Sequence, residues 1–186
     1  LLEERIILKE DAIKILIEEY NNSESGISSY WEDSLQDFEY KDREFYGKGL
    51  PEGKGGYNNG IIEFIHYLLQ TPFRLQGVKF KEFNYILRTA QKCHEYRNNK
   101  MRLGTLRQVI ALAFLEEQIN ISKLTEPIVI IGDGYGIMAS LILSHFPQLI
   151  GKVVLVNLTQ NLLIDAAFIR KSVSEVNVAL VKNEIE

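Results

Sequence analysis

The chain has 186 residues, of which 46% are apolar and 25% are charged, so it can form one sizeable hydrophobic core and does not have the composition of a disordered protein. The net charge is −4, with acidic and basic residues interleaved, and the absence of a basic stripe excludes nucleic acid as an expected partner. No apolar run approaches the roughly 18 residues of a membrane span, and no signal peptide is recognisable, so we expect a cytoplasmic protein with no membrane partner.

Amphipathic helices are predicted through most of residues 1–122, because apolar residues recur there at intervals of three and four. The expected helices cover residues 9–20, 61–70, 83–97 and 106–119, with a further short helix after Ser28 or Ser29. Thr71-Pro72 should end the helix at 61–70, which is apolar on most sides and should lie centrally in the bundle. Gly104-Thr105 should cap the helix at 106–119.

Residues 40–60 interrupt this helical pattern. They are rich in glycine, lysine, aspartate and tyrosine, and they follow neither the helical nor the strand period. We expect a long mobile loop, either a surface linker or a lid in which Tyr46, Tyr57 and Asn58 reach a substrate.

Cys93 is the only cysteine. It has no Cys-x-x-Cys spacing and only His94 beside it, so we expect no disulfide, no redox role and no metal site.

Residues 123–186 alternate strands and helices and form the second expected domain. Strands are predicted at 128–131, 152–157 and 178–181, and helices at 137–146 and 162–173. The order β-α-β-α-β predicts an α/β fold that starts a Rossmann-like, doubly wound parallel sheet. His145 lies near the end of the first of these helices, where the helix dipole should favour its protonated form.

The strand at 128–131 leads into Gly132, Asp133, Gly134, Tyr135 and Gly136. Glycines permit positive φ and let a ligand approach the backbone, while the amides of the following helix point at that ligand. A dinucleotide-binding turn would need its third glycine at the position of Ile137, but here it comes one residue earlier. A plain strand-to-helix turn without a ligand is the alternative interpretation.

The spacing Gly-x-Gly-x-Gly after an apolar strand resembles the first motif of the class I S-adenosylmethionine-dependent methyltransferases. In particular, Ile-Gly-Asp-Gly-Tyr-Gly at 131–136 and Leu-Val-Asn-Leu-Thr-Gln-Asn-Leu at 155–162 resemble the sugar O-methyltransferase family, which reads roughly Ile-Gly-x-Gly-Tyr-Gly and then Val-Asp-Leu-Pro-Glu-x-Leu. The stretch Ser29-Tyr30-Trp31 is a weaker match. The resemblance implies S-adenosylmethionine as cofactor and a small-molecule acceptor, with a sugar hydroxyl as the acceptor group.

Two positions depart from this family pattern. The residue that closes the second strand usually carries a carboxylate for the ribose hydroxyls, but here it is Asn157, followed by Leu158, and the usual acidic position two before the first glycine is Ile130. The resemblance implies that Asn157 and Leu158 join the turn in holding the cofactor, with Asp133 as either a polar contact or a turn-stabilising residue. An aspartate at position 157 should then strengthen binding by on the order of 1 kcal/mol.

The expected sheet is incomplete, because three strands are fewer than this fold requires and the acceptor-binding residues of the family come later. We therefore expect the native protein to continue past Glu186, and no catalytic residue is assigned. A noncatalytic interaction module of the same fold is the second hypothesis, and a nicotinamide- or flavin-dependent oxidoreductase is the third. Self-association into a homo-oligomer is left open.

Overall fold

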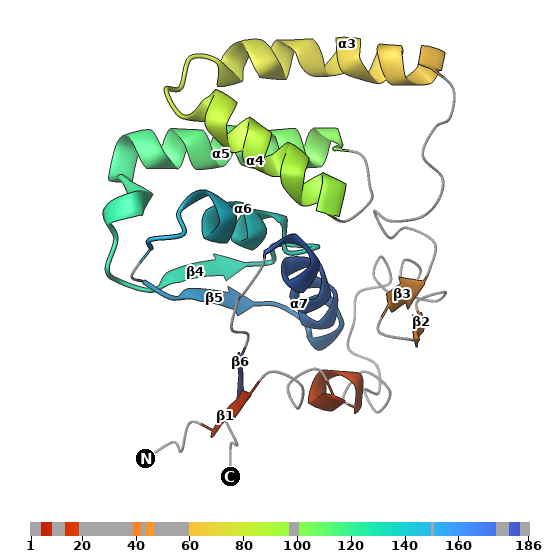
Figure 1. Cartoon of the computed structure of the whole chain (residues 1–186), viewed down its shortest axis with the longest axis vertical. Coiled ribbons are helices and arrows are strands. Elements are labelled where there is room, and N and C mark those ends of the chain that lie inside the picture. The colour runs from red at the N-terminus through yellow and green to blue at the C-terminus, as the bar shows by residue number, and fades with distance from the viewer. Residues whose placement is uncertain are drawn as a thin grey trace.

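The computed structural model of the chain describes residues 5–8, 14–18, 39–41, 44–46, 60–96, 101–149, 151–173 and 179–182. These residues form a mixed α/β structure that is mostly helical, and Figure 1 shows its layers. Helix α3 (Gly60–Gly77) lies outermost, α4 (Phe83–Tyr96) and α5 (Leu103–Ile119) come next, and α6 (Ile137–His145) lies between them and the parallel strands β4 (Ile128–Ile131) and β5 (Val153–Val156). Helix α7 (Thr159–Ser172) follows β5, and the short 3-10 helix η1 (Ile121–Lys123) precedes β4.

The main hydrophobic core lies between these helical layers. Helix α4 forms as predicted, because Phe83, Ile86, Ala90 and Cys93 follow helical spacing and are all buried on one side. The core also takes side chains from α5 and α6, so residues on both sides of the expected domain boundary at 122 share one apolar cluster. Its buried members are Phe83, Ile86, Ala90, Leu106, Val109, Leu112, Ala113, Ile121, Leu141, Ile142 and Phe146.

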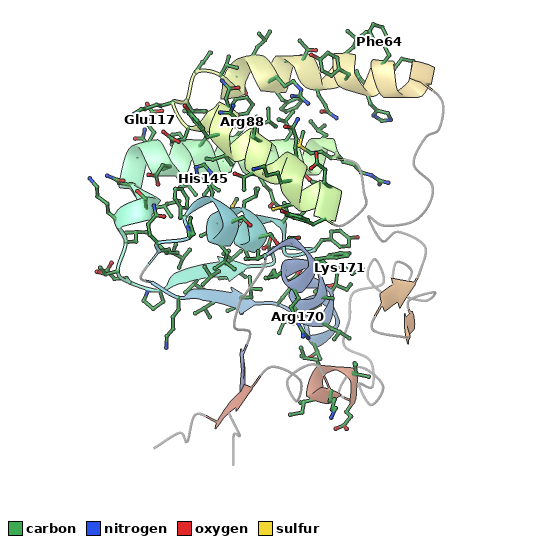
Figure 2. The ribbon with its side chains drawn as sticks, viewed as in Figure 1. Phe64, Arg88, Glu117, His145, Arg170 and Lys171 are labelled. Atoms are coloured by element: carbon green, nitrogen blue, oxygen red, sulfur yellow. The ribbon has the colours of Figure 1, made fainter. Side chains whose placement is uncertain are left out.

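Two expectations about α3 are wrong. The helix continues through Pro72 to Gly77. Pro72 and Leu68, whose carbonyl loses its helical donor, are both exposed, so this carbonyl is open to solvent. The helix ends at Gly77, which lies so close to Phe83 that a Cβ there would overlap the Phe83 ring. The helix is also not central: Phe64, Ile65, Tyr67, Leu68 and Leu69 are all exposed, and Phe64 projects from its outer side (Figure 2).

Helix α5 starts earlier than expected. Its first residue is Leu103 and the residue before it is Arg102, so Gly104 and Thr105 lie within its first turn and do not cap it. Thr105 is buried, and its Oγ1 lies 2.9 Å from His94 Nε2. The hydroxyl thus joins α5 to α4.

The first strand and its surroundings are predicted well. Strands β4 and β5 pair in parallel, with Ile128 opposite Val153 and Ile131 opposite Val156, and α6 and α7 follow them in the expected order. The strands are buried on one face only, however. Ile128 and Ile130 pack against the core, whereas Val129 is 57% exposed and Ile131 is 80% exposed.

The third expected strand exists, but its pairing is not the predicted one. Strand β6 (Ala179–Lys182) pairs antiparallel with β1 (Arg5–Leu8), with Arg5 opposite Lys182 and Leu8 opposite Ala179. The apolar run in β1 was not recognised as a strand, and it supplies β6 with a partner from the other end of the chain. Within the described residues the parallel sheet therefore has two strands, and a Rossmann-like half-fold is not established.

Part of the stretch expected to be a loop at 40–60 forms strands. Strands β2 (Glu39–Lys41) and β3 (Glu44–Tyr46) pair antiparallel, with Glu39 opposite Tyr46, and their charged and aromatic alternation is too short to register as a period. Residues 47–59, including Tyr57 and Asn58, lie outside the described residues, as does the short helix expected after Ser28 or Ser29 with Tyr30 and Trp31. Of the helix expected at 9–20, residues 14–18 are described and are helical.

The expectation for His145 is corrected by its surroundings. Burial lowers the pKa of this imidazole, and the opposing effect of Glu82 and Glu116 does not restore it. Its Nδ1 lies 3.2 Å from Thr89 Oγ1 and its Nε2 lies 3.8 Å from Glu82 Oε2, which places the ring at the contact of α4 with α6 (Figure 2). Desolvation between the two helices thus outweighs the favourable effect of these two carboxylates on the protonated imidazole.

None of the described helices combines the length and the apolar character that crossing a membrane requires.

Candidate ligand-binding site at the glycine turn

The parallel pairing of β4 with β5 brings the glycine turn and Asn157 to the same edge of the sheet. The two strands are in register up to Ile131 and Val156, and the ladder continues for one more bond, in which Gly132 N–H donates to Val156 O at 2.9 Å. The carboxyl ends of parallel strands are where α/β sheets bind ligands. The structure thus brings together the two segments that the sequence selects.

The turn is built from left-handed backbone. Gly132, Gly134 and Gly136 have φ of 69°, 56° and 59°, and Tyr135 has φ of 78°. A non-glycine residue in this region is strained and persists only where its surroundings hold it. Tyr135 packs on the cluster of Leu16, Leu163, Ile164 and Phe168, with its ring centroid 5.9 Å from that of Phe168.

The three glycines have different surroundings. A Cβ added at Gly132 or Gly134 would meet no atom of the described residues within 4 Å, so these residues leave one side of the turn open. A Cβ at Gly136 would lie 2.7 Å from the backbone oxygen of Asp165 and 2.9 Å from the Ile169 side chain. Gly132 and Gly134 therefore leave room for a ligand, whereas Gly136 is needed for the contact of the turn with α7.

Asp133 stabilises the start of α6. Its Oδ1 accepts from Met138 N–H and its Oδ2 from Ala139 N–H, both at 2.9 Å. These amides belong to the first turn of the helix, where they have no intrahelical acceptor, and a carboxylate there also interacts favourably with the helix dipole. Of the two roles weighed for Asp133, the turn-stabilising one accounts for both of its carboxylate oxygens.

Asp165, on α7, belongs to the site although it was not predicted from the sequence. It is completely buried, and its carboxylate joins the two segments of the site: Oδ1 accepts from Gly136 N–H at 2.7 Å, and Oδ2 accepts from Asn157 Nδ2 at 3.0 Å. Burial raises the pKa of the Asp165 carboxyl to about 6; hydrogen bonding to Asn157 opposes the rise, and the nearby Asp133 carboxylate adds to it.

A signal for Asp165 is present in the sequence. Positions Asn161, Ile164, Phe168 and Ser172 follow helical spacing and are buried, and Asp165 falls within the same stripe. A single carboxylate on the buried side of a helix needs a partner. This requirement, together with the amide of Asn157 at the end of the preceding strand, indicates the pairing of Asp165 with Asn157.

Asn157 is held from both sides of its amide. Its Nδ2 donates to Asp165, while its Oδ1 accepts from Leu158 N–H at 3.0 Å and from Asn161 Nδ2 at 3.3 Å. Leu158 is the residue that precedes α7, and its side chain is 45% exposed beside the strand end. The Asn157 side chain at the end of β5 is thus held in place by hydrogen bonds to Asp165, Leu158 and Asn161.

Helix α5 also reaches the turn. Gln108 Nε2 donates to the backbone oxygen of Asp133 at 3.5 Å, and Gln108 Oε1 is buried without a hydrogen-bond partner among the described residues. No motif in the sequence pointed to Gln108. The helical part of the chain therefore adjoins the candidate site.

In the part of the chain that the structure describes, no group of three or more His, Cys, Asp and Glu side chains is placed to hold a metal ion. Comparisons of the chain with protein-family models, with curated proteins and with solved structures found no match.

Proposed function

We propose that the chain binds S-adenosylmethionine over Gly132–Gly136, with the ribose towards Asn157 and Leu158, and that it forms part of an O-methyltransferase whose acceptor is a sugar hydroxyl. The glycine spacing and the resemblance at residues 131–136 and 155–162 support the cofactor, and the resemblance alone supports the acceptor class. A cytoplasmic location belongs to the same proposal.

The observation that carries the choice of cofactor is the position of Asp133. A dinucleotide places its pyrophosphate on the free amides at the start of the helix after the glycine turn. Here the Asp133 carboxylate already accepts from Met138 and Ala139 N–H, and Asp165 lies buried behind the turn. Two carboxylates repel a phosphate and favour a cofactor that lacks phosphate and carries positive charge, as S-adenosylmethionine does.

The open side of the turn fits this cofactor. Even a Cβ at Gly132 or Gly134 would meet no described atom within 4 Å, so the described residues place no side chain in the way of an adenosine that approaches these glycines. When bound, S-adenosylmethionine supplies a sulfonium methyl group that is already activated for transfer to oxygen. The contribution of these residues is to bind and orient, and a catalytic base is not assigned to any of them.

The second candidate is a noncatalytic binding module with the same turn. The observation that favours it is the internal pairing of Asn157, whose amide nitrogen and oxygen both bond to neighbouring protein groups. A ribose would have to share the Asn157 oxygen with Leu158 N–H and Asn161. The oxidoreductase hypothesis is weakened by the occupied helix amides.

The test is a calorimetric titration of the protein with S-adenosylmethionine, S-adenosylhomocysteine and NADH. The proposal predicts saturable binding of the first two and none of NADH. Binding of NADH alone would support the oxidoreductase, and binding of none of the three would support the noncatalytic module.

A glycine variant locates the binding site. Gly134→Val fills the open side of the turn, strains its backbone at φ 56° and should abolish binding. Gly104→Val, at another position where a Cβ meets no described atom within 4 Å, should bind like the parent protein. Thermal unfolding of both variants checks that each is folded. A folded Gly134→Val variant that titrates like the parent would place the site elsewhere.

A further inference from the structure

We propose that ionised Asp165 is a positioning residue that holds the glycine turn and Asn157 in the arrangement that binds the ligand, so that protonation of Asp165 weakens binding. The effect on affinity rests on the proposed function. The effect on the turn does not, because it concerns only contacts within the protein.

The geometry gives Asp165 this role. One carboxylate oxygen accepts from the last residue of the glycine turn, Gly136 N–H, and the other accepts from the strand-end side chain, Asn157 Nδ2. A carboxylate accepts at both oxygens, whereas a protonated carboxyl has a hydroxyl on one of them and becomes a donor there. The Tyr135 backbone N–H also donates to this carboxylate. The hydroxyl would face one of these donors, so protonation breaks at least one contact.

Asp165 changes its protonation state close to neutral pH, because burial raises the pKa of its carboxyl to about 6. Asp133, in the turn before α6, is the charged group that raises this pKa further. In the helical residues 14–18, whose Leu16 packs on α7, Lys14 and Glu18 are exposed. On α4, Arg88, Lys92 and Glu95 are exposed, and buried His94 lies 2.9 Å from Thr105 Oγ1. On α6, His145 faces Thr89 and Glu82. On α7 itself, Arg170 is exposed and Lys171 is half-buried, and both lie at its carboxyl end (Figure 2).

In the hydrogen-bonded pair of Asn157 and Asp165, the carboxylate of Asp165 carries a charge and the amide of Asn157 is neutral. Asn157→Asp alone would place two carboxylates about 3.0 Å apart across the present contact and would remove the donor, so the gain expected from that single change no longer follows. The exchanged pair, Asn157→Asp with Asp165→Asn, again places a donor opposite an acceptor between positions 157 and 165 and at Gly136, Leu158 and Asn161. The new amide at 165 can accept from Gly136 and donate to position 157, and the new carboxylate at 157 can accept from Leu158 and Asn161.

The experiment follows the Gly136 amide resonance in the ¹⁵N-labelled protein between pH 8 and pH 5, together with the dissociation constant for S-adenosylhomocysteine. In the parent protein the Gly136 resonance should titrate with a midpoint near pH 6, and binding should be about tenfold weaker at pH 5, where roughly one Asp165 in eleven stays ionised. Asp165→Asn should remove both responses and weaken binding at pH 8. The exchanged pair should recover the Gly136 shift and bind within about threefold of the parent at pH 8.

Glu117→Gln is the matched control, because it removes an exposed carboxylate of α5 (Figure 2) and should leave both pH responses unchanged. A Gly136 resonance that does not titrate in the parent protein, or one that titrates equally in Asp165→Asn, would overturn the proposal. Failure of the exchanged pair to recover the Gly136 shift would also overturn it. Absence of S-adenosylhomocysteine binding at every pH would refute the proposed function instead, and the Gly136 titration would still decide whether Asp165 positions the turn.

Discussion

At the scale of single residues, Asp165 illustrates how a candidate site can reduce stability. A carboxyl whose pKa is raised on folding binds more protons in the native than in the unfolded state between pH 3.8 and about 6. Its contribution to stability is therefore complete below about pH 4 and is lost as the pH rises through 6. The protein keeps an ionised carboxylate here at neutral pH at a cost in folding free energy.

The first prediction measures this cost. The free energy of unfolding of the parent relative to Asp165→Asn should decrease from pH 4 to pH 7 by on the order of 3 kcal/mol, which is the value of a pKa shift of about two units. Urea unfolding of both proteins across this pH range checks it. Subtracting the two free energies cancels the pH dependence that the other carboxylates cause in both proteins. A difference that stays constant with pH would show that folding does not raise the pKa of Asp165.

The second prediction compares two glycines of the same turn. Gly132→Ala should cost about 1 kcal/mol, because only the positive φ opposes it. Gly136→Ala should cost roughly 2–4 kcal/mol, because its Cβ also meets the Asp165 backbone and the Ile169 side chain. The midpoints of denaturant unfolding measure the stability of both variants. An equal loss of stability at the two positions would contradict the different surroundings of Gly132 and Gly136.

At the scale of elements, α6 depends on a carboxylate outside the helix. The residue immediately before the helix is Gly136, which has no side chain to cap it, and Asp133 takes over that task from three residues earlier in the chain.

The third prediction follows from this arrangement. Asp133→Ala should destabilise the protein by about 1–2 kcal/mol, and Asp133→Asn should destabilise it less, because an amide oxygen can still accept one of the two bonds. The measurement is urea unfolding at pH 7. If the two variants have equal stability, the second bond and the charge contribute nothing to the cap.

The elements that the sequence predicts correctly depend on local information. Helix α4 and the order β4, α6, β5, α7 follow from apolar spacing over a few turns and from glycine and proline at the boundaries. The continuation of α3 through Pro72 was missed because residues after the proline pack inward, Phe73 on the core and Gly77 beside Phe83, and local spacing does not report these contacts.

Long-range pairing was not predictable in the same way. The antiparallel partner of β6 is β1, more than 170 residues earlier in the chain, and no local period encodes a partner. The glycine turn and Asn157 were selected correctly as neighbours, since parallel strands bring their carboxyl ends together. Asp165 was not selected, because apolar residues lie on most sides of α7, and the single carboxylate among them was not weighed as a buried group that needs a partner.

At the scale of the whole molecule, the parallel strands carry an apolar face that the described residues leave open. Val129, Ile131, Val154 and Val156 are exposed there, although parallel sheets are normally covered on both faces. Exposed apolar patches of this kind mark contact surfaces or promote association.

The fourth prediction is that the 186-residue chain self-associates as its concentration rises, and that Ile131→Thr reduces the association. Light scattering across a dilution series measures it. Arg107→Thr, an exposed substitution on α5, serves as a control and should associate like the parent. A chain that stays monomeric at every concentration would show that the apolar face does not drive association.

The measurement that tests the central proposal most directly is the crystal structure of the chain with S-adenosylhomocysteine. We expect electron density for the ligand over Gly132 and Gly134, with its ribose within hydrogen-bonding distance of Asn157 and with the Asp133 contacts to Met138 and Ala139 intact. A ligand bound away from the glycine turn, or a turn that must release Asp133 to admit it, would contradict the proposal.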